Sequence, residues 1–289
     1  MTFDPDAAID YLHWVRERHN IWGARQDGAL QKWWTDDPIL SSVKFTNVYR
    51  VLDPGSQFVL TDLDCASELD TLARLVLYRY TNLPATWEYV KEHGGTRRYP
   101  LAADMGPDLV ELINTKPGKK FSGAYMIIPQ PGYAGDKVQM CVELVARLRD
   151  NGSLDRFLEA ESQEARHAAL KDNYGVGNFL AMQILTDWGY TRHCPADREG
   201  DFVVFGPGSK RGAAHLGVST IHEAMELLHA QPDCPVLDGR KPSLMDCQNT
   251  LCEYSKYYRF LYQGKRSAGR PYSPAHPGTQ PIPVLPRWW

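Results

Sequence analysis

The stretch "NYGVGNFLAMQILTDWGY", residues 173–190, decides the fold of the region around it. A segment rich in helix-forming residues precedes it and ends near Lys171, and an amphipathic helical pattern starts at about residue 178. Between the two, Gly175 and Gly177 permit positive φ angles and the close approach of another backbone. The sequence therefore predicts two helices joined by a tight glycine turn, a helix-hairpin-helix.

The backbone amides at the start of the second helix make this turn a candidate anion site. The first amides of a helix lack intrahelical partners, and the helix dipole adds partial positive charge at the same end. Such a site holds one DNA phosphate without reading a base. The predicted phosphate contacts are Gly175, Val176, Gly177 and Asn178. Tyr174 and Val176 are predicted to be the apolar anchors of the hairpin. The structural alternative is an ordinary pair of helices with a glycine turn.

Two aspartates are candidate catalytic acids. Asp201 lies 24 residues beyond Gly177 and opens the segment "DFVVFGPGSKRG". A carboxylate there suits cleavage of an N-glycosidic bond, because it stabilises the oxocarbenium character of the deoxyribose and orients water. At about 4 Å and an effective dielectric constant near 20, one charge contributes roughly 4 kcal/mol, or about a thousandfold in rate. Asp187 is the competing candidate; the alternatives are a loop acid for Asp201 and a helix cap or buried ion-pair partner for Asp187.

Two polar motifs could line a pocket for a base extruded from the DNA stack. Amides can read a pyrimidine edge or sugar hydroxyls, and arginines can hold phosphate or acidic partners. The candidate residues are Asn47, Tyr49 and Arg50 in "FTNVYR", and Tyr78, Arg79 and Asn82 in "LYRYTN". The alternative is a polar network that locks helices together.

A basic motif follows the candidate acid. Ser209, Lys210 and Arg211 lie in "GPGSKRG", predicted as a glycine-flanked loop that contacts a second phosphate. Lys256 and Arg259, one turn apart on the last predicted helix, extend the same track. The alternative is a surface turn. From Tyr254 to the end the chain has six basic residues and no acid, which favours either an anion-facing surface or a solvated tail.

Composition limits the class of protein. The chain has 289 residues, 43% of them hydrophobic and 23% charged, with a net charge of −3, which suits one large domain or two closely packed lobes. No apolar run approaches the roughly 20 residues needed to cross a bilayer, and the first residues do not resemble a signal peptide. We therefore expect a cytoplasmic protein without membrane contact.

Several familiar chemistries are excluded by pattern. The sequence has no P-loop motif, no second histidine after "HEAME" for a zinc helix and no G-x-S-x-G elbow. The six cysteines are scattered without zinc-ligand spacing, so they are predicted to be reduced thiols. No metal and no cofactor is expected.

The periodicity predicts a mainly α fold with two closely packed helical lobes and few short strands. Helical patterns cover residues 66–81, 134–149, 153–172, 221–230 and 244–261, with two short aromatic-rich segments within 6–34 and a turn at Pro54-Gly55. Strand-like runs are 124–129 and 201–206. Residues 1–270 are predicted as a single domain of two lobes. Residues 271–289 hold six prolines and form either a flexible tail or a strap packed on the body.

Four segments carry a family resemblance: "TDDPILSSVKFTNVYRVLD", "YGVGNFLAMQILTDWGY", "DFVVFGPGSKRG" and "LCEYSKYYR". They resemble the family of DNA base hypermodification proteins that contain the helical domain associated with 5-hydroxymethyldeoxyuridine DNA kinases. The resemblance covers most of residues 33–260. It implies a helix-hairpin-helix DNA-glycosylase-like fold, in which an aspartate follows the G-x-G hairpin by some 20 residues, as Asp201 does here. A bacterial antiphage glycosylase that removes α-glucosylated 5-hydroxymethylcytosine resembles the same group of proteins.

The same resemblance implies a mechanism. Lyase-capable glycosylases carry a lysine two positions after the second hairpin glycine, where this chain has Phe179, and the four-cysteine iron–sulfur loop of some relatives is missing. The resemblance thus favours a monofunctional glycosylase that excises a hypermodified pyrimidine, such as α-glucosyl-5-hydroxymethylcytosine, from double-stranded phage DNA and leaves an abasic site.

Two other functions stay open. One is a transferase that attaches an amine or amino acid to pyrophosphorylated 5-hydroxymethyluracil in DNA, and the other is a non-catalytic reader of modified DNA. No obligate protein partner is evident for any of the three.

Overall fold

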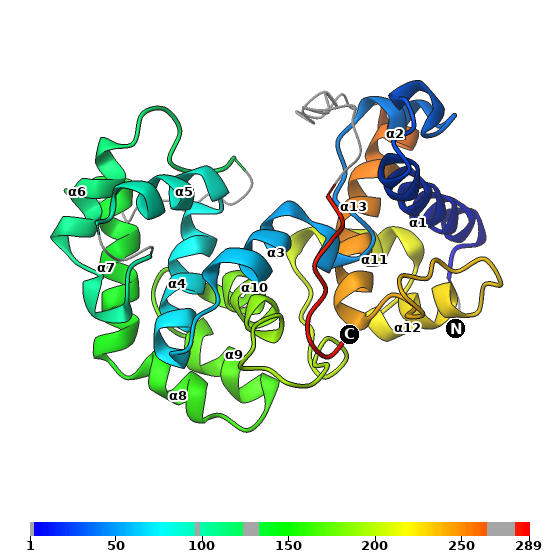
Figure 1. Ribbon diagram of the computed structural model, residues 1–289. Coiled ribbons are helices and arrows are strands. Elements are labelled where there is room, and N and C mark those ends of the chain that lie inside the picture. Colours follow the sequence, from blue (N-terminus) through cyan, green and yellow to red (C-terminus); the bar gives the residue numbers. More distant parts are fainter. Residues whose placement is uncertain (1–2, 96–98, 124–132, 265–280) are drawn as a thin grey trace. The chain divides into compact units, whose positions relative to one another are not determined.

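The computed structural model describes residues 3–95, 99–123, 133–264 and 281–289, and helices dominate these ranges (Figure 1). The predicted mainly α class is confirmed. The α-helices are α1 (Pro5–Gln26), α2 (Pro38–Ser42), α3 (Pro54–Phe58), α4 (Glu68–Thr81), α5 (Pro84–His93), α6 (Pro107–Thr115), α7 (Lys137–Asp150), α8 (Ser153–Glu159), α9 (Gln163–Lys171), α10 (Gly177–Gly189), α11 (Pro207–Leu216), α12 (Ile221–His229) and α13 (Leu244–Gln263). Short helical turns are η1 (Gln31–Trp33), η2 (Arg50–Leu52), η3 (Val59–Leu63) and η4 (Ala102–Asp104).

The expected strands are not found in the described ranges. Extended pairing there is limited to an isolated bridge between Leu237 and Arg240. The prediction of a strand at 201–206 is wrong, because residues 202–206 have no partner strand and lead directly into α11 at Pro207. The other predicted strand, 124–129, lies outside the described residues.

The chain divides into two compact units, each made of two separate pieces of sequence. Unit 1 consists of the described residues of Met1–Asp53 and Val203–Pro283, and unit 2 of those of Pro54–Phe202 and Val284–Trp289. Unit 1 is organised around α13, against which α1, α2, α11 and α12 pack. Thr220 and Glu223 form the predicted capping box at the start of α12.

Unit 2 is organised around α4, in which every residue from Thr71 to Thr81 is buried. Ser67 caps the start of α4 by accepting a hydrogen bond from the Asp70 amide, and Asn82 ends it in the left-handed conformation at φ +45°. Helices α7, α8 and α10 pack against α4, and α9 packs on α8 and α10. The predictions at 66–81 and 134–149 are confirmed as α4 and α7.

Three local predictions were wrong. Residues 153–172 form two helices, because Ala160 is extended and Ser162 caps a new helix by accepting a hydrogen bond from the Ala165 amide. The region 6–34 contains one 22-residue helix, α1, rather than two short ones, since Asp4 caps it and its apolar residues share one helical face. Pro54 begins helix α3 instead of a turn.

The C-terminal residues contact the body of unit 2. The Trp288 indole Nε1 donates to the Gly189 carbonyl at 2.8 Å, and the Trp288 ring stacks on Tyr190 with centroids 6.4 Å apart. Gln57 exchanges two hydrogen bonds with the backbone of Val284, at 2.9 and 2.8 Å. These are the contacts of a strap. No helix within the described ranges is both long enough and apolar enough to cross a bilayer.

The segment "GPGSKRG" is the first half of α11 and not the predicted loop, because Pro207 occupies the first helical turn and Ser209 caps the Gly206 amide. Its glycines let α11 approach α13 closely. A Cβ atom on Gly212 would overlap the Leu251 carbonyl oxygen, and one on Gly208 would overlap the Cys252 sulfur. The two helices can pack in this way only if both positions lack side chains.

We expect Gly212→Ala to destabilise unit 1, because the added methyl group overlaps backbone that cannot move aside. The loss in free energy of unfolding is expected to be roughly 1–3 kcal/mol or more, measured by urea denaturation. Gly23→Ala in α1 is the matched control, since no heavy atom lies within 4 Å of the position that its methyl group would occupy. It should stabilise the protein by roughly 0.5–1 kcal/mol. Equal effects of the two substitutions would contradict this account of the α11–α13 contact.

Candidate functional site

The two helices and the glycine turn predicted from residues 173–190 are formed by α9 and α10 in unit 2. Both turn glycines have positive φ angles, +85° at Gly175 and +61° at Gly177. Gly175 is also a point of close approach, because a Cβ atom there would lie 2.8 Å from a methyl carbon of Leu144 on α7. Each glycine therefore has a physical reason to be glycine.

The turn is exposed. Gly175, Gly177 and Asn178 are all accessible to solvent, and no described side chain caps the start of α10. Val176 is the buried anchor of the turn, and its amide donates to the Asn173 carbonyl at 3.1 Å. The interpretation of Tyr174 as a second anchor was wrong, since its side chain is 43% exposed. The first turn of α10 thus meets the geometric requirement for the predicted phosphate contact, which itself stays a prediction.

A buried histidine connects the turn with the segment that carries Asp201. The His167 side chain on α9 donates from Nε2 to the Asn178 carbonyl at 3.0 Å. The His167 ring also contacts the ring of Phe202, with the two centroids 5.2 Å apart. Burial lowers the pKa of His167, which keeps the ring neutral at physiological pH. The residue following Asp201 is therefore packed on the same side chain that contacts the first turn of α10.

Asp201 itself lies at the surface of unit 2. Its side chain is 43% exposed and accepts a hydrogen bond from the Arg198 guanidinium at 2.8 Å. This contact raises the pKa of Arg198. The carboxylate lines a pocket of about 220 Å³ formed by the start of α9 and residues 198–202. Asp201 is thus accessible to a ligand and has one cationic neighbour.

Asp187 has a different environment. It is completely buried in α10, and both of its oxygens accept hydrogen bonds from the Nε and Nη2 atoms of Arg79 on α4. Arg79 is likewise buried, so the two charges form a bidentate ion pair inside the protein. Asp187 is thus a buried ion-pair partner, which was one of the structural alternatives to a catalytic role. Its catalytic role stays a prediction, and neither carboxylate oxygen is exposed to support it.

Three of the predicted base-pocket residues converge on one glycine in unit 2. A Cβ atom on Gly55 would lie 3.1 Å from the Tyr78 hydroxyl, 3.8 Å from Arg79 Nη1 and 4.0 Å from Asn82 Oδ1. Arg79 Nη1 donates to Asn82 Oδ1 at 3.3 Å, and the Asn82 amide donates to the Ser122 hydroxyl at 3.1 Å. The motif therefore brings the polar groups of Tyr78, Arg79 and Asn82 together next to the backbone of Gly55.

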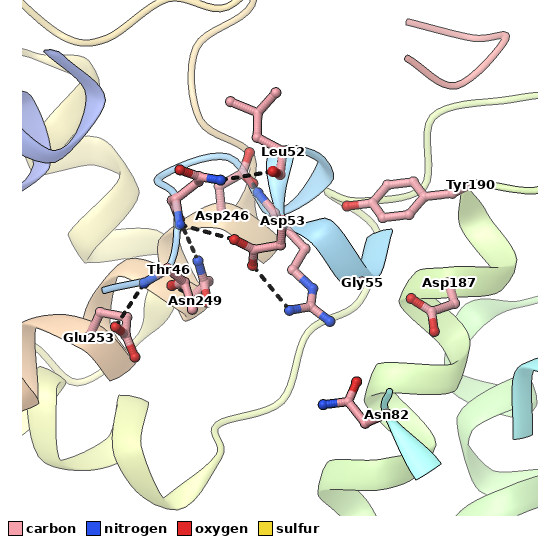
Figure 2. Close-up of polar contacts among 12 residues, drawn as sticks. Thr46, Leu52, Asp53, Gly55, Asn82, Asp187, Tyr190, Asp246, Asn249 and Glu253 are labelled. Carbon is pink, nitrogen blue, oxygen red and sulfur yellow. Dashed lines mark hydrogen bonds and ion pairs between the residues drawn. The ribbon is translucent and has the colours of Figure 1, made fainter. Parts of the chain in front are cut away.

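The other three predicted base-pocket residues belong to unit 1, and two of them, Asn47 and Arg50, contact the buried carboxylate of Asp53, which is labelled in Figure 2. Asp53 accepts from the Asn47 amide at 3.0 Å and from Arg50 Nη1 at 3.4 Å. Tyr49 is fully buried and donates its hydroxyl to the backbone carbonyls of Pro235 and Arg240. These contacts give Asn47, Tyr49 and Arg50 structural roles, and a base pocket that includes them remains a prediction.

Two buried carboxylates of this network were not identified from the sequence. Burial raises the pKa of Asp53, against the opposing effect of Arg50. Burial also raises the pKa of Asp246 to about 6, although the Arg50 amide and the Ser243 amide and hydroxyl donate to it. The capping spacing Ser243-x-x-Asp246 at the start of α13 was the available signal.

The predicted cationic track has a partial counterpart on α11 and α13. Lys210 and Arg211 are exposed, whereas Ser209 is buried and bonded to Gly206 and Gln248, so it is not available to phosphate. Arg211, Lys256 and Arg259 all lie close enough to Cys252 to oppose the burial that raises its pKa to about 11. Arg211 of α11 therefore lies in the neighbourhood of Lys256 and Arg259 of α13, and Lys256 also pairs with Glu253.

Sequence reasoning also missed Gln163, His167, Arg198 and Phe202. Gln163, His167 and Leu170 form the buried face of α9, at spacings of four and three residues. Polar residues on an otherwise apolar face were the only sequence signal for Gln163 and His167. Arg198 and Phe202 lie in a loop, where periodicity carries no information.

Comparison with known proteins places these helices in a family. The sequence profile of the 5-hmdU DNA kinase helical domain matches residues 6–266. A relative, the 5-hmdU DNA kinase of Bacillus phage SP10, is 25% identical over 303 aligned positions, which cover 84% of this chain and 44% of that protein. The chain thus spans less than half the length of the curated relative that it matches. No solved structure matches significantly.

The described residues define a helical protein with an exposed glycine turn and an accessible acid in the same compact unit. By its sequence, the chain belongs to the 5-hmdU DNA kinase helical domain family. The resemblance seen in the four quoted segments is therefore confirmed at the level of the family.

Asp187→Asn is expected to destabilise unit 2 strongly, because it leaves the Arg79 guanidinium buried without its counter-charge. The expected loss in free energy of unfolding is roughly 3–5 kcal/mol, measured by urea denaturation. Asp233→Asn, which removes the exposed carboxylate that pairs with Arg16, is the matched control and should change stability by at most about 1 kcal/mol. A stable Asp187→Asn protein would show that the buried pair is dispensable for folding.

Proposed function

We propose that this chain binds double-stranded DNA, everts a modified pyrimidine and hydrolyses its N-glycosidic bond, with Asp201 as the catalytic carboxylate. The product is an abasic site, because the hairpin position at which lyases carry lysine is Phe179. The observation that carries this proposal is the placement of an accessible acid and an exposed helix N-terminus in one unit, joined through His167.

The environment of the two aspartates supports Asp201 over Asp187. A carboxylate that stabilises an oxocarbenium-like sugar must approach the reacting carbon and keep its negative charge. Asp201 is exposed and can meet a nucleoside. Both Asp187 oxygens are already used by Arg79, and breaking that pair would leave a buried charge uncompensated.

The two candidate phosphate contacts contribute to DNA binding in different ways. In unit 2, the first turn of α10 can bind one phosphate through backbone amides, without reading sequence. In unit 1, the exposed Lys210 and Arg211 supply charge for salt-dependent attraction, and Arg259 and Lys256 extend it. Both contacts are independent of base identity, so the choice of base must come from elsewhere.

The name of the SP10 relative suggests the class of base. That protein is a 5-hmdU DNA kinase, and we propose that this chain likewise acts on a pyrimidine bearing a hydroxymethyl group or a larger substituent at C5, with α-glucosyl-5-hydroxymethylcytosine as the preferred candidate. A second function is transfer of an amine or amino acid to an activated 5-hydroxymethyluracil, and the 5-hmdU in the family's description supports this base as the substrate. In that reaction the exocyclic methylene reacts and the N-glycosidic bond stays intact.

One assay separates excision, transfer and binding alone. The protein is incubated, with and without an amino acid as amine donor, with duplexes that contain glucosylated 5-hydroxymethylcytosine, pyrophosphorylated 5-hydroxymethyluracil or unmodified pyrimidine. The products are treated with alkali and analysed by mass spectrometry. We expect alkali-dependent breaks at modified sites only. Asp201→Asn should lower the single-turnover rate by roughly 100- to 1,000-fold without loss of stability, because its ion pair with Arg198 is exposed.

Asp150→Asn is the control, since Asp150 also forms an exposed ion pair with a neighbouring arginine. A gain of mass on the base without abasic sites would replace excision by transfer. DNA binding without either product would leave a reader of modified DNA. Full activity of Asp201→Asn would remove this residue from the mechanism.

The cationic face of unit 1 has its own test. Replacing Lys210 and Arg211 together by alanine should weaken binding to modified and unmodified duplexes alike. It should also reduce the slope of log affinity against log salt by roughly 2, because two phosphate contacts are lost. The measurement is fluorescence anisotropy at several salt concentrations, with Lys116→Ala/Lys119→Ala as the charge-matched control. An unchanged slope would show that α11 does not contact phosphate.

A further inference from the structure

The pocket beside Asp201 contains a buried polar group that nothing in the described protein satisfies. Gln163, at the start of α9, is only 6% exposed, and its Oε1 atom has no hydrogen-bond partner among the residues that the structure describes. The same holds for the buried Nε atom of Arg166. Both residues line the pocket. Buried polar atoms without partners are rare, so an unpaired acceptor and an unpaired donor on two residues that line the same cavity point to a ligand as their partner.

The exposure of the lining residues distinguishes an inner end of the pocket from its rim. Gln163 is buried, whereas Asp201 and Arg198 are 43% and 47% exposed at their side chains and therefore form the rim. Phe202 supplies an aromatic ring, held in place by its contact with His167. A ligand that enters would meet hydrogen-bonding groups at its inner end, an aromatic ring along its path and the Asp201 carboxylate at its outer end.

Size and charge select the ligand. The volume of about 220 Å³ is below the roughly 300–1,000 Å³ of pockets for drug-sized molecules, so it suits the pyrimidine ring alone, and a glucosyl group on C5 has to stay outside it. Three acidic residues, Glu161, Glu164 and Asp201, outnumber the two arginines, which disfavours a phosphate. A neutral planar ring that presents a donor and an acceptor on one edge fits all of these features, and a pyrimidine base is such a ring.

We propose that this pocket binds the everted pyrimidine, with Gln163 and Arg166 hydrogen-bonding its polar edge and Phe202 contacting its face. The base then enters edge first, and its N-glycosidic bond lies at the rim beside Asp201. This inference rests on the proposed function for the identity of the ligand. It assigns base recognition to Gln163 and Arg166, which are separate from the six residues predicted from the sequence.

The test measures eversion separately from chemistry. A duplex carries one 5-hydroxymethylcytosine next to 2-aminopurine, whose fluorescence rises when its neighbour leaves the stack. We expect Gln163→Met and Arg166→Met to reduce the equilibrium for eversion by roughly 10- to 100-fold. Overall DNA affinity should stay nearly constant because it comes from phosphate contacts. Gln163→Glu keeps an acceptor and should retain most of the eversion, which separates recognition from a folding defect.

Gln139→Met on α7 is the matched control, because the Gln139 amide already donates to Glu143. Wild-type eversion by both methionine variants would overturn the inference, and so would the absence of eversion in the wild-type protein. A wild-type protein that everts the base in a Gln163-dependent way but leaves the glycosidic bond intact would refute excision and preserve the pocket. Excision that does not depend on Gln163 would support the proposed glycosylase activity and refute the assignment of this pocket to the base.

Discussion

The buried ion pair between Arg79 and Asp187 fixes α10 against α4, and the orientation of the glycine turn depends on it. Two charges removed from water are costly unless each is fully hydrogen-bonded, and the bidentate geometry meets that condition. Asp187 lies near the C-terminal end of α10, while the exposed turn forms the opposite end. Because a helix is rigid over this length, the buried pair sets the direction in which the first turn of α10 presents its amides.

A second constraint acts at the turn itself. Gly175 contacts Leu144 on α7, and His167 on α9 bonds to the Asn178 carbonyl. The turn is thus held by contacts from two helices, α7 and α9, although its own backbone is exposed. Such an arrangement suits a contact with a rigid partner such as a DNA backbone, because little conformational entropy is lost when binding occurs. The same imidazole positions Phe202, so the pocket beside Asp201 is built on the helix that supports the turn.

The sequence predicted what depends on local periodicity and on glycine. Helices α4, α7, α10, α12 and α13 follow from apolar spacing and caps, and the positive φ angles of Gly175 and Gly177 follow from the turn that they form. The strand expected at 201–206 failed because a strand needs a partner, which no local pattern supplies. The loop expected at "GPGSKRG" failed because its glycines serve the contact with α13, a tertiary requirement that resembles loop composition.

Polar residues were harder to interpret, since the same residue type serves structure and function. Arg79 and Asp187 were predicted as a base contact and a catalytic acid, yet each satisfies the other inside the core. Asn47, Tyr49 and Arg50 are likewise occupied by backbone and by Asp53. Deciding between the two roles requires knowledge of the partner in space. That knowledge is absent from a single sequence and is supplied by the fold.

The contrast between satisfied and unsatisfied polar groups is the strongest pointer to chemistry in unit 2. A fold that satisfies both oxygens of Asp187 in its core leaves Gln163 Oε1 and Arg166 Nε without described partners at a pocket open to solvent. Each such group costs roughly 1–3 kcal/mol, a substantial fraction of the roughly 5–15 kcal/mol that keeps a domain folded. These two groups keep their hydrogen-bonding capacity for a ligand, and the residues that carry them line the pocket next to the exposed acid. Where function requires an open donor and an open acceptor, a protein must accept the lower stability that they bring.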